Sequence, residues 1–349
     1  MPVIAAFLVT SLVTWMLKIA AAGTRLVQAP GAHRRHESAT PIVGGLGMFA
    51  GAAAGWLWVP GQIPMLALML AAGLALVLGL WDDLRPRSHY ARFLGQIAAA
   101  GLMVGAGGVV LTDLGQLVSE SQLFLGKWSV PLTIFATIGV MNAVNMSDGM
   151  DGLAGSLCLL AVMGVGAVAA VGGDWLKVAY LGPIAGALLA FLVLNLRIGT
   201  QVRAQVFMGD AGSLFLGLLM AWMFIDASQG VDRVISPVTA LWLFALPLCD
   251  AVRSLIRRPA QGQSPFQADS SHYHHHLRAC GLSVTQTLWV SLLTALLCSG
   301  IGIWGVYAEV PDRFMFAGFL GVFALYLGGM EYLVRVLSNR PQRVIGRRA

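Results

Sequence analysis

The sequence predicts an all-α, polytopic membrane protein with about eleven transmembrane helices. Hydrophobic residues make up 57% of its 349 positions and charged residues only 11%, whereas a soluble domain carries about 25% charged residues. Apolar runs long enough to cross a bilayer, about 17–25 residues each, recur along the chain. They cover residues 3–20, 41–59, 63–81, 93–111, 128–146, 153–172, 176–195, 211–226, 234–252, 286–307 and 314–334. We therefore expect one integral membrane domain over residues 1–349.

The distribution of Lys and Arg predicts the orientation of these helices. If the N-terminus lies outside, the inner connections receive all but four of the 22 Lys and Arg residues, the exceptions being Lys127, Lys177, Arg233 and Arg313. This asymmetry follows the positive-inside rule, so we expect a cytoplasmic C-terminus with a basic tail at 335–349. The same asymmetry accounts for most of the net charge of +6, and we expect no nucleic-acid partner. The first apolar run precedes Lys18, which indicates a retained helix rather than a cleaved signal.

The four cysteines predict neither a disulfide nor a zinc site. Three of them, Cys158, Cys249 and Cys298, fall inside predicted helices, and Cys280 falls in a predicted cytoplasmic connection. No CxxC spacing occurs, so we expect four free thiols.

The first inner connection carries HRRHE at 33–37 and TPIVGGLG at 40–47. The basic motif could hold a lipid phosphate or a nucleotide, or it could be ordinary topological charge. Gly44, Gly45 and Gly47 indicate close packing against another helix rather than chemistry.

The third predicted helix ends in two adjacent carboxylates, Asp82 and Asp83, followed by Arg92 ten residues after the first of them. Neighbouring carboxylates raise one another's tendency to bind a proton unless a cation lies between them. The pair therefore suggests a metal site or a base, with a solvated loop pair as the alternative.

The most informative stretch is NAVNMSDGMDGLA at 142–154, between two apolar runs. Asp148 and Asp151 lie there with Asn142 and Asn145 just before them. An isolated carboxylate in hydrocarbon costs at least about 2.5 kcal/mol, so both should lie at a membrane surface or in a wet cavity. The alternative is that Asp148 merely caps the following helix. Two carboxylates with two asparagines favour a functional site.

The connection at 197–213 places Asp210 at the start of the eighth predicted helix. The helices that begin near Leu153 and Ala211 both start at the cytoplasmic face, so we expect their N-terminal amides to face a phosphate. Phe207 could stack on a base or anchor the chain at the membrane interface.

The longest inner segment, 253–286, contains a cluster of imidazole and guanidinium groups. A metal site is one interpretation, because His is the commonest metal ligand. Binding of a diphosphate by these donors is the other, and basic residues close by favour it. The cluster comprises His272, His274, His275, His276, Arg257, Arg258 and Arg278.

Several connections thus bring acidic, amide and basic side chains to one membrane face. Carboxylate and amide oxygens suit Mg²⁺ or Mn²⁺ better than zinc. A divalent ion beside phosphate-binding donors indicates phosphoryl transfer. A secondary transporter is the rival interpretation, but it would place carboxylates in mid-helix and broken helices in two repeated halves.

Four motifs in this order resemble the polyprenyl-phosphate N-acetylhexosamine-1-phosphate transferases. They are DD at 82–83, NAVNMSDGMDGLAG at 142–155, VFMGDAGS at 206–213 and HYHH at 272–275. The resemblance implies transfer of a sugar 1-phosphate from a UDP-N-acetylhexosamine to undecaprenyl phosphate, with release of UMP. It also implies a multi-pass protein of the bacterial inner membrane, with a periplasmic N-terminus and a cytoplasmic active site.

The motif SPF followed by DxxHxHH, at 264–275, is most similar to the WecA branch. That branch uses UDP-GlcNAc and starts lipid-linked surface glycans such as O antigen. The additional His276 is typical of the MraY branch, which uses a pentapeptide-bearing donor, so that branch and other UDP-amino sugars stay open. The oligomeric state also stays open, with a homodimer as one option.

The resemblance further implies roles for individual residues. A metal, Mg²⁺ or alternatively Mn²⁺, would be held by Asn145 and Asp210. The catalytic residues would be Asp82, Asp83, Asp148, Asp151, His272, His274 and His275. Substrate would be bound by Arg92, Asn142, Phe207, Arg257, Arg258 and Arg278, with Arg92 beside the lipid phosphate and Phe207 stacked on the uracil. Direct attack and a covalent aspartyl intermediate both remain open.

Overall fold

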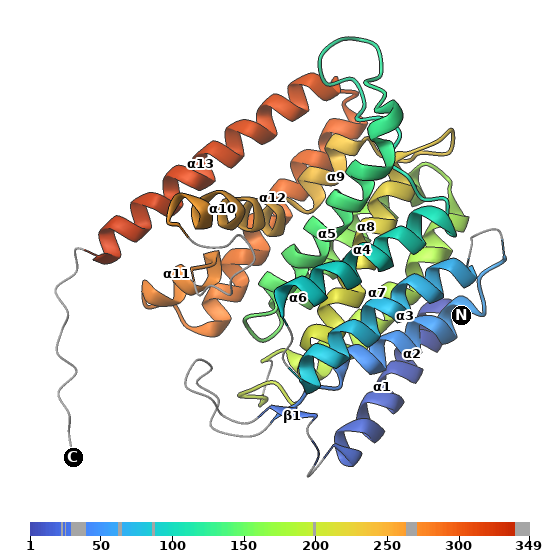
Figure 1. Ribbon diagram of the computed structural model, residues 1–349, viewed down its shortest axis with the longest axis vertical. Helices are drawn as coiled ribbons and strands as arrows, with labels where there is room; N and C mark the ends of the chain where they lie inside the picture. The colour runs from blue at the N-terminus through green and yellow to red at the C-terminus, as the bar shows by residue number, and fades with distance from the viewer. Residues whose placement is uncertain are drawn as a thin grey trace.

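The computed structural model describes residues 1–21, 24, 26–28, 40–61, 65–85, 88–197, 200–262 and 271–338. Almost all regular structure in these ranges is helical, as the sequence predicts (Figure 1). The helices are α1 (Pro2–Ala20), α2 (Gly44–Trp56), α3 (Met65–Leu84), α4 (His89–Gly105), η1 (Gly126–Trp128), α5 (Ser129–Ser147), α6 (Leu153–Val171), α7 (Trp175–Asn195), α8 (Gly209–Ser228), α9 (Pro237–Leu243), α10 (Ala245–Ala260), α11 (Tyr273–Ala279), α12 (Val284–Tyr307) and α13 (Asp312–Ser338).

The prediction of an all-α chain misses one short strand pair. Strands β1 (Val27–Gln28) and β2 (Thr40–Pro41) pair antiparallel, with Val27 opposite Pro41. Each strand has two residues and no apolar periodicity, so the pattern carries no strand signal.

Every predicted span falls on a helix or a bent helix pair. Eight described helices are long and apolar enough to cross a membrane, or nine if α9 and α10 count as one broken span. The two remaining predicted segments correspond to α2, with 13 residues, and α4, with 17.

The predicted span at 234–252 is not one continuous helix. The chain breaks at Phe244, and α10 turns by 90° from α9 (Figure 1). The segment 253–286, predicted as one long connection, contains the second half of α10 and all of α11. Its basic residues Arg257 and Arg258 therefore project from a helix rather than from a loop.

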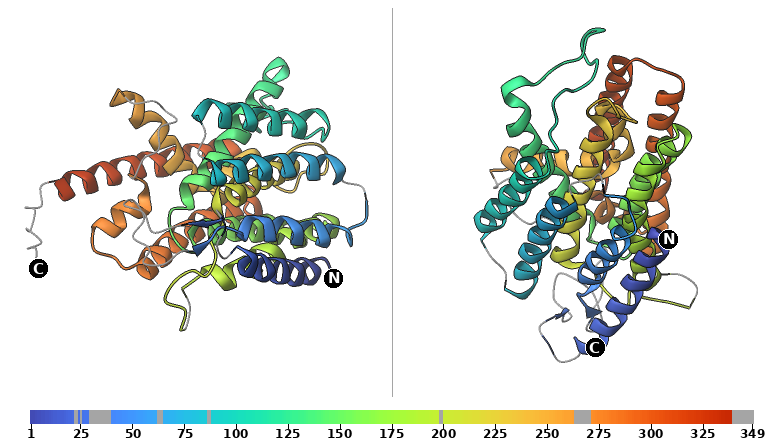
Figure 2. Two further views of the ribbon diagram at one scale, coloured as in Figure 1. Left: turned by 60° about the horizontal axis from the view of Figure 1, so that its bottom comes forward. Right: turned by 90° about the vertical axis from the view of Figure 1, so that its right-hand side faces the viewer.

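Helix α8 forms the centre of the bundle and packs against α2, α3 and α5. Its side chains are almost wholly buried. Glycines bring the neighbours close: a Cβ at Gly45 would meet the backbone of Gly212, and one at Gly79 would meet the backbone of Asp210. Small residues of this kind let helix backbones approach in membranes. They fix where α8 starts relative to α2 and α3, which run roughly side by side with α1 and α4 in Figure 2.

The α4–α5, α8–α9 and α12–α13 connections contact one another at the end of the bundle where α8 ends. Gln229 accepts a hydrogen bond from the amide of Thr112, and the amide of Gln116 donates to Asp312. The guanidinium of Arg313 lies 4.0 Å from Glu120. Three basic residues that the sequence assigns to the outer side have acidic partners at this end. Lys177 pairs with Asp226 in the last turn of α8, Arg233 with Asp113, and Arg313 with Glu120.

Candidate active site

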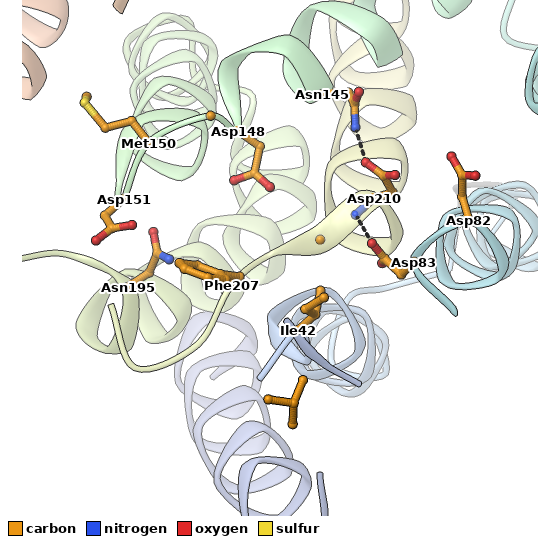
Figure 3. A pocket seen from close by; sticks show the side chains of 13 residues that line it. Ile42, Asp82, Asp83, Asn145, Asp148, Met150, Asp151, Asn195, Phe207 and Asp210 are labelled. Carbon is orange, nitrogen blue, oxygen red and sulfur yellow. Dashed lines mark hydrogen bonds between the residues drawn. The ribbon is translucent and has the colours of Figure 1, made fainter. Parts of the chain in front are cut away.

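Five carboxylates line one cavity of about 320 Å³ at the ends of the helices (Figure 3). Asp82 and Asp83 come from the end of α3, Asp148 and Asp151 from the α5–α6 connection, and Asp210 from the first turn of α8. Asn145, Asn195 and Phe207 complete the polar and aromatic part of the lining, which includes no Lys or Arg among the described residues. The structure therefore brings together seven residues that the sequence predicts as site residues.

The centre of the cavity is a chain of hydrogen bonds through Asp210. Its backbone amide and that of Ala211 donate to the two carboxylate oxygens of Asp83, at 2.9 and 3.0 Å. The amide nitrogen of Asn145 donates to Asp210 Oδ1 at 2.6 Å and to Ser213 Oγ at 2.9 Å. Gly209 has φ +72°, and a Cβ there would meet Ile42 and Asp83. Only glycine fits this turn, which holds Asp210 against α3.

These contacts correct one prediction. We expect from sequence that the first amides of α8 face a phosphate, but Asp83 already accepts two of them. A carboxylate at a helix N-terminus satisfies orphan amides and is favoured by the helix dipole. Asp83 therefore acts here as an anchor for α8.

The opposite wall of the cavity is fixed by buried polar contacts. Asp151 Oδ2 accepts hydrogen bonds from Arg197 Nε at 2.7 Å and from the amide of Ala204 at 3.2 Å. Asn195 accepts from the amide of Gly152 at 2.7 Å and donates to the carbonyl of Val206 at 2.8 Å. The α5–α6 and α7–α8 connections are thus tied together beside Phe207.

The interpretation of Asp148 as the cap of the next helix is wrong. Asp148 directly follows α5, whereas the residue before α6 is Gly152, with φ +80° and no side-chain cap. The glycine permits a left-handed turn that keeps the carboxylate of Asp148 on the cavity side.

A second polar chain joins α3, α4 and α5 beside the cavity. The guanidinium of Arg92 lies 3.6 Å from the carboxylate of Asp82 and donates to Asn142 Oδ1 at 3.4 Å. Asn142 in turn donates to Gln96 Oε1 at 3.2 Å. Arg92 and Asn142, both predicted to bind substrate, therefore contact one another next to a lining carboxylate.

The histidine cluster reaches the cavity through His274. Its ring lies against Gly149, where a Cβ would meet His274 Nε2, and Gly149 is next to Asp148. The rings of His274 and His275 have centroids 4.1 Å apart, and His272 lies about 6 Å from both. Among the described residues, the buried Nε2 of His274 has no hydrogen-bond partner. It is buried against Gly149, which lines the cavity, whereas His274 itself is not among the lining residues.

Burial changes the charge expected for this cluster. Desolvation, with smaller contributions from His275 and His272, lowers the pKa of His274 to about 3. Burial and the neighbouring Arg253 also lower the pKa of His276. We expect imidazolium donors from the sequence, but the lowered pKa favours the neutral imidazole of His274 at pH 7, and this form can donate or accept only one hydrogen bond at Nε2.

The three predicted arginines of this region do not line the cavity. Arg257 donates to Gln261 Oε1 at 2.9 Å, Arg258 is buried on α10, and Arg278 is exposed and donates to the carbonyl of Leu282. The HRRHE motif at 33–37 and the SPF motif at 264–266 lie outside the described residues.

Two residues that shape the cavity, Asn195 and Arg197, are not predicted as site residues from the sequence. Asn195 ends a long apolar helix, and a polar side chain in such a position is itself a signal of function or of a buried contact. Arg197 was counted only as topological charge, because nothing in its local sequence indicates the partner Asp151.

The donor set fits a hard divalent cation. Among the described residues, no three His, Cys, Asp or Glu side chains converge closely enough to enclose an ion. Mg²⁺ commonly takes only one or two protein carboxylates and completes its shell with water and substrate phosphates. Asp210 and Asn145, whose Nδ2 lies 2.6 Å from Asp210 Oδ1, carry side-chain oxygens of this kind in a strongly acidic cavity.

Residues 65–228, which contain all five carboxylates, match glycosyl transferase family 4. The chain is 35% identical over 325 residues to the undecaprenyl-phosphate alpha-N-acetylglucosaminyl 1-phosphate transferase of Escherichia coli (strain K12), covering 93% of this chain and 88% of that protein. Proteins of the same name from Yersinia pestis and Haemophilus influenzae (strain ATCC 51907 / DSM 11121 / KW20 / Rd) are 35% and 33% identical, covering 83% and 91% of their own lengths and 86% and 93% of this chain. The chain belongs to glycosyl transferase family 4.

Membership of glycosyl transferase family 4 confirms the resemblance found in the sequence. The chain is therefore a membrane-embedded transferase enzyme, and the transporter interpretation is set aside. The family match at 65–228 ends before the histidine cluster, so α10, α11 and α13 lie outside it.

We predict that His274→Ala and His275→Ala impair turnover more than His276→Ala. His274 and His275 stack on one another beside Gly149, whereas His276 Nε2 bonds to the carbonyl of Ser271 away from the cavity. We expect a loss of about 100-fold for the first two, a size typical of groups that act on a reacting centre, and less than about tenfold for the third. Initial rates of the purified variants test this, and equal losses for all three would contradict it.

Proposed function

We propose that the protein transfers N-acetylglucosamine 1-phosphate from UDP-GlcNAc to undecaprenyl phosphate and releases UMP. The relatives described above carry names for the same transfer to undecaprenyl phosphate. The observation that supports it most is the convergence of five carboxylates on one cavity at the helix ends. Two anionic substrates can react there only if a cation screens their charges. The product would start a lipid-linked surface glycan such as O antigen.

In this reaction an oxygen of the lipid phosphate attacks the phosphorus that is bonded to the sugar, and the bond from that phosphorus to the oxygen of UMP breaks. The second pKa of a phosphate monoester is about 6, so the acceptor is already largely ionised at pH 7. Direct attack therefore needs little help from a base. Mg²⁺, or Mn²⁺ in its place, would neutralise charge on the diphosphate when bound.

Residues of the chain would bind the metal, the lipid phosphate and the diphosphate. Asp210 and Asn145 would hold the metal, and Asp83 keeps Asp210 in place by anchoring α8. Arg92, beside Asp82, would hold the lipid phosphate at the edge of the bundle. His274, which packs against Gly149 of the cavity wall, would lie near the diphosphate.

The nucleotide would lie toward the opposite wall. Phe207 offers an aromatic face for the uracil, in a part of the lining that Asn195 and the Asp151–Arg197 pair hold together. Stacking of a base on an aromatic ring contributes about 1–3 kcal/mol.

We predict that UDP-GlcNAc outperforms UDP-MurNAc-pentapeptide and, by a smaller margin, UDP-GalNAc. The motif at 264–275, which is most similar to the WecA branch, is the basis of this expectation. Discrimination between the two epimers depends on whether a buried polar group loses its partner when a hydroxyl inverts.

Competition among the three donors at equal concentration, with undecaprenyl phosphate, Mg²⁺ and a UMP readout, tests the donor. Preferential use of the pentapeptide donor would assign the chain to the MraY branch. Failure of wild-type protein to release UMP from any of them would reject the proposed function.

We further propose that all eleven segments cross the inner membrane, so that the N-terminus is periplasmic and the acidic cavity faces the cytoplasm. The charge asymmetry supports this orientation. Val231, 99% exposed between α8 and α9, then lies outside, and the exposed Gln261 at the end of α10 lies inside.

We predict that an impermeant maleimide labels Val231→Cys but not Gln261→Cys in intact cells. Cys280→Ser is a suitable background, because Cys158, Cys249 and Cys298 are buried. Permeabilised cells serve as the control in which both sites react. Labelling of Gln261→Cys in intact cells would contradict the proposed topology.

A further inference from the structure

The start of α11 is clamped by side chains from α10. Asp250, which is 6% exposed, accepts hydrogen bonds from His272 Nδ1 at 2.9 Å and from the amide of Tyr273 at 3.0 Å. One helical turn later, the buried Arg253 donates to the carbonyl of Ser271 at 2.9 Å. Side chains of α10 therefore hold both the ring of His272 and the backbone on either side of it.

A third contact comes from the last helix of the chain. Tyr326 on α13 donates its hydroxyl to Asp250 Oδ1 at 2.7 Å. The ring of Tyr326 also lies 6.0 Å from that of Tyr273. Asp250 thus accepts three hydrogen bonds, and its two oxygens are held from α11 and α13 at once.

This geometry places a hydrogen on Nδ1 of His272. A carboxylate can only accept, so Nδ1 of His272 must carry the hydrogen of that bond. The hydrogen bond sets the plane of the ring and leaves Nε2 as the ring nitrogen that faces away from Asp250. Because the His272 ring lies beside those of His274 and His275, its orientation bears on the two histidines nearest to the cavity.

We propose that Asp250 and Tyr326 are positioning residues that fix the tautomer and orientation of His272, and through it the histidine cluster. Helix α13 would then help to position the histidine cluster, through the hydrogen bond from Tyr326 to Asp250, in addition to crossing the membrane. The effect on turnover rests on the proposed function, whereas the effect on His272 itself does not.

Steady-state kinetics with UDP-GlcNAc test the role through a double-mutant cycle. We expect Asp250→Asn to lower kcat by roughly 10- to 100-fold, the range seen when partners that orient functional histidines are removed, and Tyr326→Phe to lower it severalfold. KM should change little, and Asp250→Glu should recover part of the loss. In the His272→Ala background neither substitution should have a further effect, because residues that act through one another are not additive.

Two controls separate positioning from simple stabilisation of the fold. Tyr332→Phe makes the same change at a 68% exposed position of α13 and should leave kcat unchanged. A purely structural role of Asp250 or Tyr326 would lower activity by the same factor with and without His272. That additive result would overturn the proposal.

Labelling of His272 with diethyl pyrocarbonate, followed by peptide mass spectrometry, gives a readout that needs no turnover. The buried ring should react faster in Asp250→Asn and Tyr326→Phe than in wild-type protein or Tyr332→Phe. Unchanged labelling in both variants would also overturn the proposal. If wild-type protein failed to use UDP-GlcNAc, the proposed function would fail while this measurement still decided the positioning role.

Discussion

Asp210→Asn is expected to remove nearly all turnover while leaving the protein folded in the membrane. Turnover should fall about 100- to 1,000-fold, as it does when one group that stabilises developing charge is lost. The amide oxygen of Asn can still accept the hydrogen bond from Asn145, so the packing of α8 should survive. The substitution removes the negative charge of the Asp210 carboxylate, however, and therefore most of the affinity for a hard cation. Initial rates over a Mg²⁺ titration measure the loss.

Asp226→Asn is the matched control, because it lies on the same helix at the opposite end. Its partially exposed pair with Lys177, at 3.3 Å, contributes at most about 1 kcal/mol of stability. Turnover of this variant should remain near that of wild-type protein. Full activity of wild-type protein in EDTA would contradict both the metal and the role assigned to Asp210.

Asp83→Ala is expected to lower turnover about 100-fold, a loss comparable with that of a charge-stabilising donor, although each carboxylate oxygen of Asp83 already accepts a backbone amide. Without its carboxylate the amides of Asp210 and Ala211 lose their partners, and the first turn of α8 is no longer held against α3. Removing a side chain that caps a helix costs about 0.5–2 kcal/mol of stability, too little to unfold the bundle. Asp83→Asn should keep only slightly more turnover than Asp83→Ala. The amide oxygen of the new Asn can accept from one backbone donor, but its NH₂ group then faces the other donor.

Ser236→Ala provides the matched control for this effect. Ser236 Oγ accepts from the amide of Thr239 at the start of α9, so the substitution removes a cap at the far end of the bundle. Thermal unfolding in detergent should show similar losses for Ser236→Ala and Asp83→Ala, while only the second loses turnover. Normal turnover of Asp83→Ala would show that α8 does not depend on this anchor.

The membrane class, the helical segments and the five carboxylates of the acidic cavity could be predicted from the sequence alone. Apolar runs are constrained by bilayer thickness, so each predicted span coincides with a helix or helix pair. Carboxylates such as Asp148 and Asp210 are conspicuous because charge at the end of an apolar run is costly without a function or a partner. The motif order identified the family before any contact was known, and the comparisons bear it out.

Only the tertiary structure decided what those residues contact. The 90° break between α9 and α10 is not predicted from the apolar runs, because residues 234–252 form one run long enough to cross a bilayer. The anchoring of α8 by Asp83 joins residues more than 120 positions apart, and the contact of Tyr326 with Asp250 joins α13 to α10. Sequence fixes which side chains are too costly to leave in lipid, whereas the partners that satisfy them depend on helix packing, which brings distant segments together.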